Sequence, residues 1–134
     1  INDANRTETD FSAETYEANY DSLVALIRAV NPNCVFIFMT NNDSYYKQRY
    51  SNPNILKVQK AMKSLAKKHQ SAYWDLYEIM GGRNSINLWE RNGLAKKDKI
   101  HFTAEGYVLE ADLLFEAIKL SYGNYLQNQY KINN

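Results

Sequence analysis

Asp98 and His101, three residues apart in the last third of the chain, are the side chains best placed to carry out chemistry. An imidazole takes a proton from a serine hydroxyl near neutral pH if a carboxylate holds its other ring nitrogen, fixes its tautomer and stabilises the imidazolium. A short turn from Asp98 to His101 would supply that contact locally. As an isolated pair, however, the two residues equally fit a loop histidine beside a surface aspartate.

A helix over residues 13–30 is the first element that the sequence predicts. Ser12 is a suitable N-cap, Phe11 and Tyr16 fit a hydrophobic staple across it, and Pro32 stops the helix. One apolar stripe at helical spacing predicts the face that turns to the core. The stripe consists of Tyr16, Tyr20, Leu23, Val24, Ile27 and Val30.

The middle of the chain predicts two strands with a helix between them. An apolar, β-rich run over residues 34–40 is typical of a strand covered on both faces, as in parallel sheets. After a polar and aromatic loop, 41–54, the pattern predicts a helix over 54–69 and a strand over 71–80. A short helix is expected around 86–90.

A last helix follows the candidate pair. Thr103 is its cap, and Phe102 and Tyr107 fit a second staple. We expect residues 124–134, rich in Asn, Gln and Tyr, to form a loosely ordered tail. The helix residues expected to face the core are Val108, Ala111, Leu114, Phe115 and Ile118.

The alternation of helices and strands predicts an α/β fold, a three-layer α/β/α sandwich with a parallel sheet and flavodoxin-like layering. A stable sheet of this kind usually has about four to six strands, and the sequence predicts two. We therefore expect N-terminal strands to be missing from this chain. Residues 1–123 would then be the C-terminal part of a single domain.

The composition is that of an ordinary globular protein, with 45% hydrophobic and 23% charged residues and a formal net charge of +1. No basic field indicates nucleic acid or a membrane surface as a partner, and no apolar run is long enough to cross a bilayer. Cys34 has no partner for a disulfide and is expected to be buried and inert. His69 could join His101 and Asp98 in a metal set. Its position at the end of a helix, where the helix dipole favours a histidine, is the simpler explanation. No metal or cofactor is predicted.

Two segments resemble the conserved blocks of the SGNH (GDSL-type) serine hydrolases. Residues 98–107, Asp-Lys-Ile-His-Phe-Thr-Ala-Glu-Gly-Tyr, resemble the last block, in which an Asp-x-x-His pair precedes the terminal helix. Asn2 and Asp3 resemble the Asn-Asp turn after the third strand. Trp74 to Tyr77, Gly81-Gly82 and Trp89 are similar to a branch common in secreted bacterial proteins.

The resemblance implies a carboxylic-ester hydrolase that works through an acyl-serine intermediate. His101 would be general base and then acid, Asp98 its orienting carboxylate, and Asn2 an oxyanion donor. The family's Gly-Asp-Ser nucleophile turn would lie upstream, and this sequence has none. The chain alone is therefore expected to be inactive without the missing N-terminal segment. Ser44 lies at the expected active-site edge but in no nucleophile elbow, so lining the substrate cleft is its expected role.

The expected substrate is an ester, with O-acetyl groups on carbohydrate or cell-wall glycan as the first choice by family analogy. Tyr45 and Trp89 would join Ser44 in binding it, since aromatic rings suit sugar stacking. A secreted or periplasmic location is favoured. The alternative is a non-catalytic module, carbohydrate-binding or structural, on the same scaffold.

Overall fold

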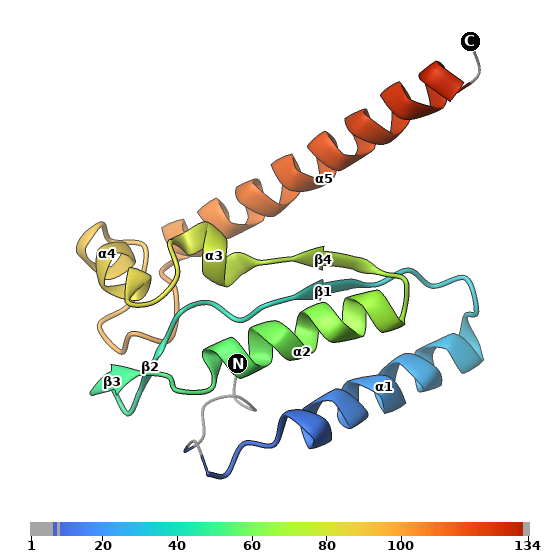
Figure 1. Ribbon diagram of the computed structural model, residues 1–134. Coiled ribbons are helices and arrows are strands. Elements are labelled where there is room, and N and C mark those ends of the chain that lie inside the picture. The colour runs from blue at the N-terminus through green and yellow to red at the C-terminus, as the bar shows by residue number, and fades with distance from the viewer. Residues whose placement is uncertain (1–6, 8, 133–134) are drawn as a thin grey trace.

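The computed structural model describes residue 7 and residues 9–132, and it shows a mixed α/β fold with a small parallel sheet (Figure 1). None of the helices within this described part is both long and apolar enough to cross a membrane. The elements in chain order are α1 (Ala13–Val30), β1 (Ile37–Met39), β2 (Tyr45–Tyr46), β3 (Tyr50–Ser51), α2 (Ile55–Lys68), β4 (Ala72–Trp74), α3 (Leu76–Met80), α4 (Ser85–Arg91) and α5 (Ala104–Ile132).

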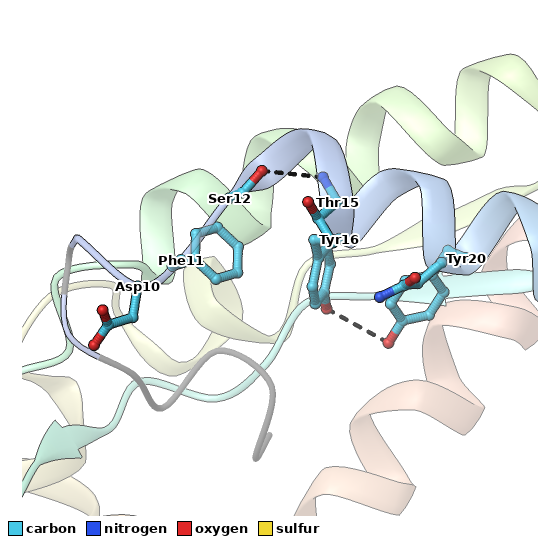
Figure 2. A pocket seen from close by; sticks show the side chains of 7 residues that line it. Asp10, Phe11, Ser12, Thr15, Tyr16 and Tyr20 are labelled. Atoms are coloured by element: carbon cyan, nitrogen blue, oxygen red, sulfur yellow. Dashed lines mark hydrogen bonds between the residues drawn. The ribbon is translucent and has the colours of Figure 1, made fainter.

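The start of α1 is as its cap and staple predict. Ser12 Oγ accepts a hydrogen bond from the Thr15 N–H at 3.1 Å, and the Phe11 and Tyr16 rings lie 5.5 Å apart. Figure 2 shows these residues around a shallow pocket formed by α1 and the segment before it, with the Tyr16 hydroxyl directed to that of Tyr20. None of the candidate site residues that the structure describes lines this pocket.

The strands β1 and β4 pair in parallel, with Phe38 opposite Tyr73 and Met39 opposite Trp74. Because side chains alternate along a strand, the sheet has two apolar faces. Phe38 packs with α1 and α2 in one cluster, whereas Trp74 packs with α4 and the first turns of α5 in another. Helices therefore lie on both sides of the sheet, α1 and α2 on one and α5 on the other (Figure 1).

The coverage of the first strand is less complete than the sequence indicates. Within the run 34–40 only residues 37–39 form the strand, and Ile37 and Val35 are 45% and 89% exposed. Cys34 is partly exposed, not buried as expected. The predicted loop 41–54 contains a short antiparallel hairpin, β2 with β3. Two-residue strands are too short to produce a detectable alternation of side chains.

The predicted strand over 71–80 is wrong in its second half, which forms α3. Asp75 caps this helix by accepting a hydrogen bond from the Glu78 N–H at 3.3 Å. Thr40, directly after the neighbouring strand β1, donates from its Oγ1 to the same carboxylate oxygen, Asp75 Oδ1, at 3.1 Å. The switch from strand to helix thus depends partly on a contact with another element.

The last helix is longer than expected and, except at Leu114, it packs against the core through other residues than those expected. It continues past Gly123 to Ile132, so residues 124–132 are helical, with exposed side chains. Val108 and Phe115 are 62% and 60% exposed. The residues that pack against the core are Leu109, Leu113, Leu114 and Ala117. Both sets have helical spacing, so periodicity alone could not choose between them.

Candidate active site

Asp98 and His101 are in contact, as the turn between them predicts. His101 Nδ1 lies 2.9 Å from Asp98 Oδ2. An ionised carboxylate only accepts hydrogen bonds, so Nδ1 carries the proton and Nε2 of the neutral ring is left as an acceptor. The His101 side chain is 51% exposed, and Nε2 has no hydrogen-bond partner among the described residues. This nitrogen is free to take a proton from a substrate or a nucleophile.

The other carboxylate oxygen of Asp98 holds the backbone of the turn. Asp98 Oδ1 accepts from the Ile100 N–H at 2.9 Å and from the His101 N–H at 3.0 Å. Lys99, between Asp98 and Ile100, adopts a left-handed conformation with φ +57°. These bonds make Asp98 both the orienting partner of the imidazole and the organiser of the loop that carries it.

The hydrogen bonds keep Asp98 ionised. Partial burial on its own would raise the pKa of Asp98, but the main-chain and ring N–H groups of His101 and the N–H of Ile100 outweigh it, and the pKa is lowered. At neutral pH the side chain is therefore a carboxylate, the form that stabilises an imidazolium.

Two contacts, one from the segment after β1 and one from the first residue of β2, fix the turn in the fold. Tyr45 N–H donates to the Lys99 carbonyl at 2.9 Å, and Asn42 Nδ2 donates to the Ile100 carbonyl at 2.9 Å. The Lys99 ammonium also lies 4.7 Å from the centre of the Tyr45 ring and donates to Asn87 Oδ1 at 2.8 Å. Since polar groups at the carboxyl ends of parallel strands commonly form the active sites of α/β proteins, this placement agrees with a functional role.

The helix that follows the pair begins against a neighbouring loop. Thr103 N–H donates to the Leu94 carbonyl at 3.0 Å, and its hydroxyl donates to the Gly93 carbonyl at 2.7 Å while accepting from the Gly106 N–H at 3.2 Å. The Phe102 and Tyr107 rings are in edge contact at 5.4 Å, which confirms the second staple. The base of α5 is thus anchored immediately after His101.

Comparison with known proteins identifies the family. The GDSL-like lipase/acylhydrolase family matches residues 1–109, most of the chain. The chain belongs to this family. A search of curated proteins finds no match.

Two solved structures have a similar fold to this GDSL-like chain. One is described as a peptidoglycan O-acetylesterase in action, with TM-score 0.76, 23% identity, and coverage of 84% of this chain and 33% of that one. The other is the esterase domain of the ORF1 protein from the zebrafish ZfL2-1 retrotransposon, with TM-score 0.58, 17% identity, and coverage of 82% and 61%. The GDSL-like chain thus spans about one third of the first protein.

The other predicted site residues differ in their exposure and in their contacts. Asn2, the predicted oxyanion donor, lies outside the described residues. Tyr45 is partly exposed, and its hydroxyl accepts from Asn87 Nδ2 at 2.8 Å. Ser44 is only 4% exposed. None of the described contacts joins the Ser44 hydroxyl to His101.

Trp89 occupies a core position. It is 6% exposed, stacks on Phe102 at 4.8 Å and donates its indole N–H to the Met80 carbonyl at 3.3 Å. A substrate contact by Trp89, expected from the sequence, finds no support in this burial. Tryptophan suits sugar stacking and core packing equally, so the residue type alone could not distinguish a substrate contact from a core position.

His69 has a separate carboxylate partner. Its Nε2 lies 2.7 Å from Asp21 Oδ1, a contact that joins the end of α2 to α1. His69 and His101 are therefore held by different aspartates. Among the described residues, no group of three or more His, Cys, Asp or Glu side chains could hold a metal ion.

Two polar residues after β1 were missed by the sequence reasoning. Asn42, 3% exposed, contacts the candidate pair's turn. Asp43 is fully buried, and its Oδ2 accepts from the Ile86 N–H at 3.0 Å, while burial raises its pKa. The signal available was a run of five polar residues, 40–44, directly after a strand.

Proposed function

We propose that this chain carries the acid–base pair of a GDSL-type serine esterase that removes O-acetyl groups from carbohydrate or cell-wall glycan. The observation that supports it is the contact of His101 Nδ1 with Asp98 at 2.9 Å, combined with an Nε2 that has no partner among the described residues. This arrangement is what a general base needs: a fixed tautomer on one side and an accessible nitrogen on the other.

In the proposed reaction, His101 Nε2 takes the proton of a serine hydroxyl as the serine oxygen attacks the ester carbonyl carbon. The imidazolium, stabilised by Asp98, then gives that proton to the leaving alcohol, and an acyl-serine remains. In the second half, His101 takes a proton from water as the water oxygen attacks the acyl carbon, and it returns that proton to the serine oxygen as the acyl–serine bond breaks and acetic acid leaves. The amide of Asn2 is proposed to donate to the oxyanion.

The proposal requires a nucleophile that these 134 residues do not present in a Gly-Asp-Ser turn. The chain alone is therefore expected to be inactive, and the serine is expected in a preceding segment of the same domain. The O-acetyl substrate is supported by family membership and by the printed description of the similar O-acetylesterase structure. A cell-wall substrate would also place the protein outside the cytoplasm, in a secreted or periplasmic location.

The test uses the complete protein from which the chain is taken. We expect it to hydrolyse p-nitrophenyl acetate, to release acetate from O-acetylated peptidoglycan and to react with a serine-directed fluorophosphonate. His101→Gln should abolish turnover. The matched control is His69→Gln, because His69 also pairs with an aspartate, at 2.7 Å, but between α1 and α2.

A complete protein that lacks a Gly-Asp-Ser turn, or that neither hydrolyses the ester nor takes up the fluorophosphonate, would overturn the esterase proposal. If such a protein still bound glycan, the non-catalytic alternative would be supported. Equal loss of turnover in His69→Gln and His101→Gln would likewise show that activity follows fold integrity and not the acid–base pair.

A further inference from the structure

Asn42 joins two parts of the chain that lie far apart in sequence. Its Nδ2 donates to the carbonyl of Asp43 at 3.0 Å and to the carbonyl of Ile100 at 2.9 Å, 58 residues away. Both partners are carbonyl oxygens, which only accept, so the atom that contacts them must be the amide nitrogen. At 3% exposed, this amide has little access to water as an alternative partner.

The Ile100 carbonyl belongs to the turn between Asp98 and His101. On the other side of the same residue, the Ile100 N–H donates to Asp98 Oδ1 at 2.9 Å. The carboxylate of Asp98 therefore holds the N–H groups of the peptides on both sides of Ile100, at 2.9 and 3.0 Å, and Asn42 holds the carbonyl of the second of these peptides. His101 follows directly, and its ring direction depends on this backbone.

We propose that Asn42 is a positioning residue for His101, which acts through the Ile100 carbonyl to keep Nδ1 on Asp98 and Nε2 directed outward. Its role in catalysis rests on the proposed esterase function, but its effect on the imidazole does not. Without the Asn42 amide, the partly buried Ile100 carbonyl loses its side-chain donor, and the turn rotates to find another donor. The Asp98–His101 contact is then lost or lengthened.

The first measurement needs no enzyme activity. In the complete protein, nitrogen-15 NMR shifts of the His101 ring report the share of the Nδ1–H tautomer in the neutral form. We expect that share to fall at least two-fold in Asn42→Ala and in the near-isosteric Asn42→Leu. Ser12→Ala is the control for lost stability, because it removes the α1 cap, which makes none of the contacts to the turn. An unchanged tautomer share in a folded Asn42 variant overturns the proposal.

The unmodified complete protein supplies a second measurement in case both variants fail to fold. The side-chain amide protons of Asn42 should exchange with solvent at least ten-fold more slowly than those of Asn41, the more exposed neighbour. Equal exchange at the two positions would show that the Asn42 bonds do not persist, and it would refute the positioning role.

The kinetic arm uses the complete protein and p-nitrophenyl acetate. Asn42→Leu should lower kcat at least ten-fold with little change in KM, since a misdirected base slows the chemical step and not binding. Asn41→Ala should leave both near wild type. If the unmodified complete protein has no esterase activity, the proposed function fails, while the tautomer and exchange measurements still decide on Asn42. If Asn42→Leu turns over as fast as wild type, the positioning role is overturned.

Discussion

Gly106 is the residue at which a single added methyl group should do most damage. A Cβ built on it would lie 1.9 Å from the Leu94 carbonyl oxygen, 2.9 Å from the Leu94 carbonyl carbon and 3.0 Å from Phe102 Cβ. Ordinary van der Waals contact begins near 3.4 Å, so the added atom and the oxygen must separate by about 1.5 Å. The first clash is with backbone, which cannot turn away as a flexible side chain does.

The separation would pull apart the base of α5. Leu94 O accepts from the Thr103 N–H at 3.0 Å, and the His101 carbonyl accepts from the Lys96 N–H at 2.8 Å in the same loop. Overpacking of this kind costs about 1–3 kcal/mol when side chains can adjust. Because a backbone contact cannot adjust, we expect Gly106→Ala to lower the free energy of unfolding by about 3 kcal/mol or more. For a domain of this size that is a fall in Tm of roughly 10–15 °C.

The assay is thermal and urea unfolding followed by circular dichroism. Gly123→Ala is the matched control in the same helix, because nothing lies within 4 Å of the Cβ that it adds. There the greater helix propensity of alanine should raise stability by about 0.5–1 kcal/mol. If Gly106→Ala unfolds at the temperature of wild type, or at that of Gly123→Ala, the close approach of α5 to Leu94 is refuted.

Three further results are expected. In the complete protein, Asp98→Asn should lower kcat on p-nitrophenyl acetate about 10⁴-fold with little change in KM, because the imidazole loses its tautomer and its countercharge; a kcat within ten-fold of wild type would contradict the role. The lowered pKa of Asp98 means that its stabilisation is present above its unfolded-state pKa and lost as pH falls through its folded-state pKa. Urea unfolding should therefore show wild type losing more stability than Asp98→Asn below about pH 4, and parallel curves would argue against this. Ser12→Ala should cost about 1 kcal/mol in unfolding free energy by losing the bond to the Thr15 N–H, whereas Ser22→Ala within α1 should change it by less than about 0.5 kcal/mol.

The helices could be predicted well because their signals are local. The observed bounds of α1, Ala13–Val30, are those expected from its cap and stripe, and α2 differs from its prediction by one residue at each end. The strand prediction over 71–80 failed where Asp75 starts a five-residue helix. Such a helix is too short to show periodicity, and its start also uses Thr40, which follows β1.

The flavodoxin-like sandwich remains a prediction beyond what the described sheet shows. Two parallel strands with helices on both sides agree with it, and the described residues add no third strand to this sheet. The exposure of Ile37, 45%, also could not be predicted, because an apolar run indicates burial without saying which neighbour provides it. Burial of a strand depends on elements from the whole domain.

In the candidate site, too, the local contacts could be predicted from the sequence and the distant ones could not. The carboxylate of Asp98 reaches the Ile100 and His101 amides and the His101 ring within four residues of chain, so the pair could be inferred from its spacing. The direction of the His101 ring is set by Asn42. This residue is 58 positions from its partner carbonyl in Ile100, so spacing in the sequence gives no signal for it. An Asp-x-x-His sequence therefore predicts that the imidazole can be paired with a carboxylate, whereas Asn42, which follows β1, determines the orientation of the imidazole. Variation at Asn42 should accordingly change catalysis while the Asp-x-x-His sequence motif stays the same.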